Sequence, residues 1–377
     1  MPPEESLDAG QRTDAPVFRM LRRAELSDAD IEELAALLEA SFPQWPGRQT
    51  GVPAVDHLRW KLEGADEDEA AILGRLGNEL AVGQTVWNQE FLLNGRSTRR
   101  IAFNDLAVSP RHRGQGLSSI HNRFKDDLLS RCEFIHLTAT KQPALFGQWQ
   151  RRGLTQLGST VSLLLRPLAG SGLRTPMVRS AAGLVLGVLL RSFARLGAWV
   201  HRVGLPADGS VTIRSIDRFD ASFDAFLARA LAPFELVISR SARHLNWRYM
   251  DPRAGAFEAR AAFAANGDLL GYAVTSPTAP LAALADLLVE PGRPDVAAAL
   301  ADDAANLCQE REGIAALECW LPPLHPTYRA LRSRRFAPVR RRLILHYRTV
   351  GVDKKLAALF AKPDVTLHYM LGDTDII

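Results

Sequence analysis

The segment from Leu106 to Ser118 constrains the fold more than any other part of the chain. An apolar run ends at Pro110, two glycines follow within a basic stretch, and helix-forming residues come next. This order predicts a strand, a tight turn and a helix in direct succession. Gly114 and Gly116 carry no Cβ, so they can adopt positive φ and let the backbone approach a ligand closely.

A turn of this kind is suited to an anion. Successive backbone N–H groups point into it at the positive end of the helix dipole, which favours a pyrophosphate. Arg111 and Arg113 add guanidinium groups whose fork geometry matches phosphate oxygens. The segment therefore predicts a binding site for a phosphorylated cofactor.

At these residues the chain resembles the GNAT superfamily of acyl-CoA-dependent N-acyltransferases. The superfamily signature is Gln/Arg-x-x-Gly-x-Gly/Ala at the junction of the fourth strand and the third helix. Here it reads Arg111-x-x-Gly114-x-Gly116. The resemblance implies acetyl-CoA, or another acyl-CoA, as the cofactor. The residues that it assigns to cofactor binding are Leu106, Ala107, Val108, Arg111, Arg113, Gly114, Gln115, Gly116, Leu117 and Ser118.

The resemblance also implies the chemistry. A primary amine attacks the thioester carbonyl directly, and a backbone N–H from the fourth strand, near residues 106–108, polarises that carbonyl. Asn104 and Asp105 are the candidate catalytic residues on this strand. Alternation places them on opposite faces unless a bulge intervenes. Asp105 is the candidate general base or a carboxylate tied to a neighbouring group, and Asn104 is a candidate for orienting a water or the amine.

The position of the family's general acid is occupied by a different residue. Superfamily members often carry a Tyr four residues before a Gly-Phe pair, and here Gly153-Leu154 follows Trp149 at that spacing. An indole N–H can donate a hydrogen bond but is no practical proton source. We therefore expect Trp149 to pack in the core or against the cofactor, and water to protonate the leaving thiolate.

The predicted elements occur twice along the chain. Strands come first as a meander and then alternate with helices, which is typical of a mixed α/β sheet. The sequence HLRWK at 57–61 is echoed by HLNWR at 244–248, each just before a predicted hairpin, which favours duplication. We expect an α/β fold with two GNAT-like domains, each a mixed, mostly antiparallel twisted sheet flanked by helices. The predicted boundaries are a disordered tail at 1–16, a catalytic domain at 17–168, a basic helical linker at 169–209 and a degenerate domain at 210–377.

The second copy departs from the signature at the matching junction. Pro291 and Pro294 remove amides that an anion site needs, and Glu290 and Asp295 repel phosphate. We therefore expect this half not to bind CoA. Its predicted role is to complete the acceptor pocket or to stabilise the first half.

Charge is distributed unevenly. Residues 134–207 contain no Asp or Glu, so this stretch attracts anions. Within it, the helix predicted at 177–203 either packs between the domains or lies peripherally on anionic lipid. The net charge of +4 is too small to predict nucleic acid binding. The three cysteines lack metal-ligand spacing, so we expect no metal site and a reducing, cytoplasmic compartment.

The sequence thus predicts an N-acyltransferase, most simply an N-acetyltransferase, acting on a primary amine. Two alternatives stay open. One is a non-catalytic CoA-binding or scaffold protein, which the missing Tyr and the ambiguous base favour. The other is an aminoacyl transferase that uses charged tRNA, since that activity also occurs on paired GNAT-like domains.

Overall fold

The computed structural model describes residues 15–43, 45–46, 51–64, 69–131, 133–140, 144–168 and 211–374. The predicted linker, with its helix at 177–203, lies outside the described residues, and so does most of the predicted tail. No helix in these ranges is both long and apolar enough to cross a membrane.

The first half follows the predicted order of elements. It contains β1 (Val17–Arg22), α1 (Asp28–Ser41), α2 (Ala54–Glu63), β2 (Glu69–Leu76), β3 (Glu79–Leu93), β4 (Arg96–Val108), α3 (Leu117–Leu129), β5 (Phe134–Thr140), α4 (Ala144–Arg151), β6 (Thr155–Gln156) and β7 (Val161–Pro167). Local chemistry sets several boundaries. The Ser27 hydroxyl caps α1 by accepting from the Asp30 amide at 3.1 Å. The β3–β4 hairpin turns at Asn94-Gly95, both at positive φ.

The second half repeats this order. It contains β8 (Val211–Ile216), α6 (Ala221–Ala230), β9 (Leu236–Ile238), α7 (Ala242–Leu245), β10 (Glu258–Ala264), β11 (Leu269–Ser276), β12 (Leu281–Val289), α8 (Pro294–Gln309), β13 (Ala316–Leu321), α9 (Tyr328–Ser333), β14 (Ala337–Val350), α10 (Lys354–Ala357) and β15 (Leu367–His368). One helix of this half is irregular. The α7 helix is four residues long and continues as a π-helical turn at Asn246–Met250.

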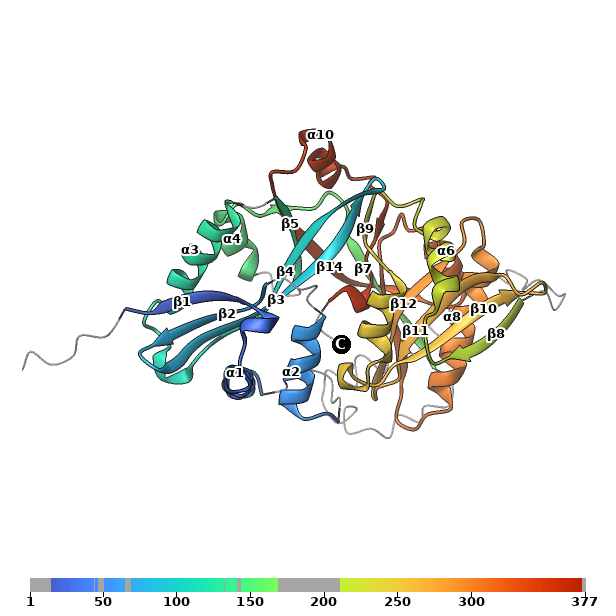
Figure 1. Cartoon of the computed structure of the whole chain (residues 1–377). Coiled ribbons are helices and arrows are strands. Elements are labelled where there is room, and N and C mark those ends of the chain that lie inside the picture. Colours follow the sequence, from blue (N-terminus) through green and yellow to red (C-terminus); the bar gives the residue numbers. More distant parts are fainter. Residues whose placement is uncertain are drawn as a thin grey trace, which may run out of the picture.

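The two halves share one sheet, because each gives its last long strand to the other. The strand order is β1-β2-β3-β4-β5-β14-β7-β13-β12-β11-β10-β8. Thus β14, from the second half, pairs with β5 of the first, and β7, from the first half, pairs with β13 of the second. Figure 1 shows β14 and β7 in the middle of the molecule, between the blue-green half and the yellow-red half. The mixed α/β fold is confirmed, and the strand exchange joins the two predicted sheets into one.

Residues of the echoed HLxW sequences meet where the halves join. The rings of Trp60 and Trp247 stack with centroids 5.2 Å apart and planes 18° apart. Each indole N–H donates to the other residue's backbone carbonyl, at 2.8 Å and 3.0 Å. This reciprocal contact is what a local two-fold relation between duplicated halves produces.

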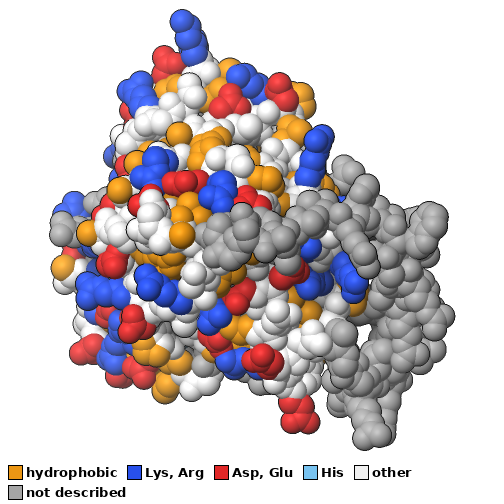
Figure 2. Space-filling view, turned by 90° about the vertical axis from the view of Figure 1, so that its right-hand side faces the viewer, with side chains coloured by type: hydrophobic (Ala, Val, Ile, Leu, Met, Phe, Trp, Pro, Cys, Tyr) orange, Lys and Arg blue, Asp and Glu red, His pale blue; other side chains and the backbone are white. Residues whose placement is uncertain are grey.

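Helices cover both faces of the sheet. In the first half, α1 and α2 lie on one face, and α3 and α4 lie on the other (Figure 1). In the second half, α8 packs an apolar stripe that includes Val296, Leu300 and Ala304 into the core beside β12. On the outer end of this half, acidic and basic side chains are interspersed over the part that Figure 2 colours.

Candidate functional site

The predicted cofactor turn lies between β4 and α3. The Ser109 amide donates to the Ala81 carbonyl at 2.8 Å, and a short 3-10 turn follows at Pro110–His112. Gly114 has a φ of 83° and Gly116 has a φ of 75°, as the sequence predicts for glycines in this turn. A Cβ built on either glycine meets no described atom within 4 Å. The turn is therefore open toward solvent.

Polar groups at the turn are available to a ligand. Among the described residues, no backbone carbonyl accepts from the amides of Gly114, Gln115 or Gly116. The Arg111 side chain is 82% exposed and lies 3.7 Å from Glu79, a distance at which a surface ion pair contributes little. Arg113 is exposed as well. These amides and guanidinium groups are donors that an anion could meet, which the predicted cofactor site requires.

Buried apolar residues fix the turn to the sheet. Leu117, the first residue of α3, is only 4% exposed and packs in a cluster with Val82, Leu106 and Val108. Ser118 points outward in the first turn of α3, and Ala107 is buried. Leu106, Ala107, Val108 and Leu117 therefore support the turn through packing, while the loop from Arg111 to Gly116 offers its polar groups.

Next to this turn, β4 and β5 separate. These parallel strands share a single paired position, Arg100 with Ile135, whereas β3 pairs with β4 as far as Val108. Beyond Arg100 the edge of β4 that faces β5 has no ladder partner in the described strands. A ligand with amide groups can pair with such an edge as an added strand would. An unpaired edge of β4 therefore leads toward the anion turn.

A β-bulge interrupts β4 at the predicted catalytic residues. The register shifts between Gly83 and Thr85 of β3, so the single residue Gln84 faces both Asp105 and Leu106. Asp105 has a φ of 50°, which is uncommon for a residue other than glycine. Ala102 packs in a cluster with Trp60 of α2, and the Asp105 carboxylate accepts from Lys61 of α2. Alternation alone would place these two side chains on opposite faces of β4. The bulge thus turns Asp105 toward α2.

Asp105 is held by an ion pair on that face. Its Oδ2 accepts from the Lys61 ammonium and from the Thr85 hydroxyl, the latter at 3.0 Å. The side chains of Lys61 and Asp105 are 3% and 11% exposed. The sequence-based alternative of a tied carboxylate therefore describes Asp105, with a lysine as its partner. The Asn104 side-chain Nδ2 is buried and finds no acceptor among the described residues.

Lys61 is the last residue of the echoed sequence HLRWK, so the sequence that indicates duplication also contains a residue of the candidate site. His57, one helical turn before it, is buried and hydrogen bonded through Nδ1 to the Arg253 carbonyl at 2.9 Å. Burial, with a further contribution from the Lys61 charge, lowers the pKa of His57 to about 4. The first half thus brings a buried lysine and a neutral histidine close to the bulge.

A second echo aligns the bulges of the two halves. The sequence DLAVSP at 105–110 corresponds to DLLVEP at 286–291, so Asp286 is the counterpart of Asp105. Asp286 is buried and accepts from Arg240 at 3.1 Å and from the Tyr272 hydroxyl at 2.9 Å. Arg240 also binds Asp373 at 2.6 Å. The second half has enclosed its bulge carboxylate in a fully buried network.

The turn of the second half is occupied by its own charges. Arg229 binds Glu290 at 2.7 Å, and Arg293 binds Asp295 at 2.7 Å. Gly292 keeps a positive φ of 77°, but the prolines on either side of Gly292-Arg293 have no amide hydrogen. This geometry agrees with a degenerate second copy.

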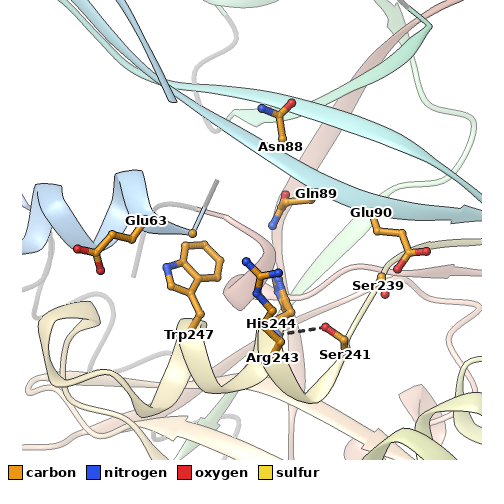
Figure 3. Close-up of a pocket in the computed structure, with 10 residues that line it drawn as sticks. Glu63, Asn88, Gln89, Glu90, Ser239, Ser241, Arg243, His244 and Trp247 are labelled. Atoms are coloured by element: carbon orange, nitrogen blue, oxygen red, sulfur yellow. Dashed lines mark hydrogen bonds between the residues drawn. The ribbon is translucent and has the colours of Figure 1, made fainter. Parts of the chain in front are cut away.

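A pocket opens on the seam between the halves. It is lined by Glu63 and Gly64 at the end of α2, by residues of β3, and by residues around α7 (Figure 3). Its lining comprises Glu63, Gly64, Asn88, Gln89, Glu90, Ser239, Ser241, Arg243, His244 and Trp247. Trp247 joins the pocket to the Trp60 stack, and Trp60 precedes Lys61. Among the described residues, no group of three His, Cys, Asp or Glu side chains could hold a metal ion.

Comparisons with known proteins give similarity in structure only. No family profile matches the sequence, and no curated protein is detectably similar to it. The chain resembles N-myristoyltransferase of Saccharomyces cerevisiae with bound myristoyl-CoA, with a TM-score of 0.57 and 12% identity over 96% of this chain and 87% of that one. It also resembles a GCN5-related N-acetyltransferase from Kribbella flavida, with a TM-score of 0.54 and 13% identity over 89% and 71% of the two chains.

A third structure of comparable likeness is a conserved protein of unknown function from Enterococcus faecalis V583. Its TM-score is 0.54 and its identity 12%, over 89% of this chain and 73% of that one. At these identities the likeness concerns the fold. Together with the repeated element order and the separated β4 and β5 strands, it shows that this chain has a GNAT-like fold in tandem form.

Proposed function

We propose that the protein is an N-acyltransferase that transfers an acyl group from acyl-CoA to a primary amine. The observation that carries this proposal is the continuity of the open anion turn at Gly114–Gly116 with the edge of β4 that is unpaired toward β5. The turn suits the pyrophosphate of CoA, and the unpaired part of β4 offers a backbone edge to an arm that contains amides. In this proposal the acyl group is acetyl.

The reaction needs few protein groups. The amine nitrogen attacks the thioester carbonyl carbon, a C–N bond forms, the C–S bond breaks, and the proton that the amine loses goes to the thiolate. Backbone amides at the bulge, near Leu106, would stabilise the oxyanion. Asp105 would accept the amine proton through a water, with Lys61 and Thr85 fixing the orientation of its carboxylate.

The seam pocket is the proposed entrance for the acceptor. It lies on the α2 side of the sheet, toward which the bulge also turns Asp105. Its lining is polar, and Figure 3 shows Glu63 and Glu90 at opposite ends, with Arg243 and His244 between them. Burial lowers the pKa of His244 to about 3, so this ring is neutral at physiological pH. Such a lining fits a polar amine better than an apolar one.

The test is a turnover assay in which a thiol reagent detects free CoA. Acetyl-, octanoyl- and myristoyl-CoA are each offered with a panel of amino acids, amino sugars, polyamines and peptides. The proposal expects thiol release that depends on both acetyl-CoA and one class of amine. Release with myristoyl-CoA alone would overturn the acetyl assignment.

A non-catalytic CoA-binding protein is the second candidate. Two observations favour it: the Asp105 carboxylate is already paired, and Trp149 stands where the family places its acid. Tight binding of acetyl-CoA by the wild-type protein, without turnover on any amine, would support this candidate over the enzyme.

A further inference from the structure

His346, a buried histidine of the second half, lies on the face of the sheet that α3 and α4 of the first half cover. His346 belongs to β14, the strand that pairs with β5, and its register partner there is Thr138. The His346 side chain is 1% exposed. Its ring lies against two residues of α4, with centroid distances of 5.1 Å to Phe146 and 5.2 Å to Trp149. His346 lies beside α4 only because β14 of the second half pairs with β5 of the first half.

Neighbouring residues identify the face on which this ring lies. Arg348, two residues further along β14, points to the same side and binds Asp126 of α3 at 2.9 Å. Asp126 also lies 3.5 Å from Arg152, directly after α4. His346 is therefore on the face covered by α3 and α4, and α3 is the helix that begins at the anion turn.

Both ring nitrogens of His346 are buried and have no hydrogen-bond partner among the described residues. An unpartnered polar atom in a core is costly, so a buried ring nitrogen without a protein partner is satisfied by ordered water, a ligand or a reacting group. Burial lowers the pKa of His346, and a hydrogen bond between the ring and the Ile344 backbone, whose geometry is too poor to satisfy the ring, offsets part of this effect. The ring is thus neutral near pH 7 and still carries one N–H.

A second buried histidine, His121, also lacks partners for its ring nitrogens within the described ranges but lies elsewhere in the first half. His121 of α3 is also fully buried, and its ring nitrogens also lack partners among the described residues. It packs against Phe18 of β1, at the opposite edge of the first half from β5. His346 instead adjoins β5, the strand toward which β4 is unpaired, and contacts Trp149.

We propose that His346 donates a hydrogen bond from its ring N–H to the sulfur of CoA as the C–S bond breaks. This inference rests on the proposed function. This N–H···S hydrogen bond stabilises the negative charge that develops on sulfur. The thiolate then takes up, through water, the proton that the amine released. No co-reactant is needed, and the imidazole is unchanged at the end of the step. The second half thereby supplies a catalytic residue to the active site of the first.

The first test does not depend on the acceptor. The full-length protein, with its histidine rings labelled with ¹⁵N, is titrated with CoA and with desulfo-CoA, which lacks the thiol. The His346 signals are assigned among the nine histidines by their loss in His346→Phe. The inference expects CoA to shift these signals and desulfo-CoA to leave them near their free positions. Binding of CoA with identical spectra for both ligands would overturn it while leaving the proposed function intact; no binding of either ligand would overturn both.

The second test uses the amine found in the turnover assay. His346→Phe fits among the aromatic rings of Phe146 and Trp149 but donates no hydrogen bond. We expect it to lower kcat about 100-fold with an unchanged KM for acetyl-CoA, as for loss of one donor to a developing anion. His121→Phe is the matched control and should retain wild-type kcat. Equal losses in both variants, or none in His346→Phe, would contradict the assignment. Urea unfolding of each variant verifies that it is folded.

Discussion

Trp60 and Trp247 stack on each other and exchange hydrogen bonds, each indole N–H reaching the other's backbone carbonyl. The two residues hold the same place in the echoed sequences HLRWK and HLNWR. The duplicated halves therefore meet through their own corresponding residues. The contact also lies beside the buried Lys61–Asp105 pair, so it couples the assembly of the halves to the geometry of the candidate site.

We expect the two tryptophans to be energetically coupled. Trp60→Phe and Trp247→Phe each keep an aromatic ring and remove one indole donor, which costs about 1 kcal/mol. A double-mutant cycle on urea unfolding should give a coupling energy of about 0.5–1.5 kcal/mol. Strictly additive effects would show that the stack has no energetic role.

Gly64 provides a steric test of the same seam. A Cβ at this residue would lie 1.8 Å from an atom of the Trp247 ring. Gly64→Ala should therefore displace the indole and reduce the fluorescence signature of the stacked pair. Gly147→Ala, in α4, is the control, because its Cβ would lie at an ordinary contact distance of 3.5 Å from the Arg151 side chain. An unchanged spectrum in Gly64→Ala would contradict this packing.

The exchanged strands predict that neither half is stable alone. Residues 1–168 without β14 would expose the edges of β5 and β7, and exposed edges promote aggregation. A protease site inserted between residues 169 and 209 tests this without removing any described element. After cleavage, the two fragments should co-elute and unfold in one cooperative transition. Separation into two soluble, folded fragments would refute the exchange.

The ion pair at the bulge predicts an asymmetric response to substitution. Lys61→Met leaves the Asp105 carboxylate buried without its cation and should destabilise the protein by about 3–5 kcal/mol. Asp105→Asn should lower kcat by a factor of about 100 or more if Asp105 is the base. The KM for acetyl-CoA should change little. An Asp105→Asn enzyme with wild-type kcat would show that the pair is structural only.

Buried histidines predict acid sensitivity. Burial, with a smaller contribution from the Lys125 charge, lowers the pKa of His121 from 6.5 to about 3. The unfolded chain therefore binds a proton that the native chain does not, between about pH 6.5 and pH 3. The stability that the neutral ring contributes is fully present above pH 6.5 and is lost as the pH falls. In His121→Leu, the slope of unfolding free energy against pH near pH 5 should fall by about 1.4 kcal/mol per pH unit. An unchanged slope would mean that the ring titrates normally.

The sequence predicted the local features of this fold well. Helix α1 follows from its cap at Ser27 and its apolar spacing, and the β3–β4 turn follows from Asn94-Gly95. The turn predicted to bind the cofactor is also local, because its glycines, arginines and helix are contiguous. These features depend on interactions within one or two turns of chain, which periodicity and turn chemistry report.

What the sequence did not show depends on long-range pairing. The exchange of β7 and β14 is invisible locally, since either strand could complete either sheet edge. The bulge at Asp105 and its pairing with Lys61 need α2 to lie over β4. His346 has no motif around it and becomes a candidate only because β14 crosses to β5. The repeated HLxW sequence could have identified Lys61 as a candidate site residue. The repeated DLxVxP sequence could have identified Asp286 as the counterpart of Asp105.

The central claim is that acyl-CoA binds at the turn of the first half and not at its counterpart in the second. Calorimetric titration of acetyl-CoA into Gly116→Asp and Gly292→Asp tests it most directly, because the two glycines have φ of 75° and 77° and equally open surroundings. Both variants carry the same backbone strain and the same added charge. The account predicts wild-type affinity in Gly292→Asp and no measurable binding in folded Gly116→Asp. Binding retained in Gly116→Asp, or absent from the folded wild-type protein, would contradict it.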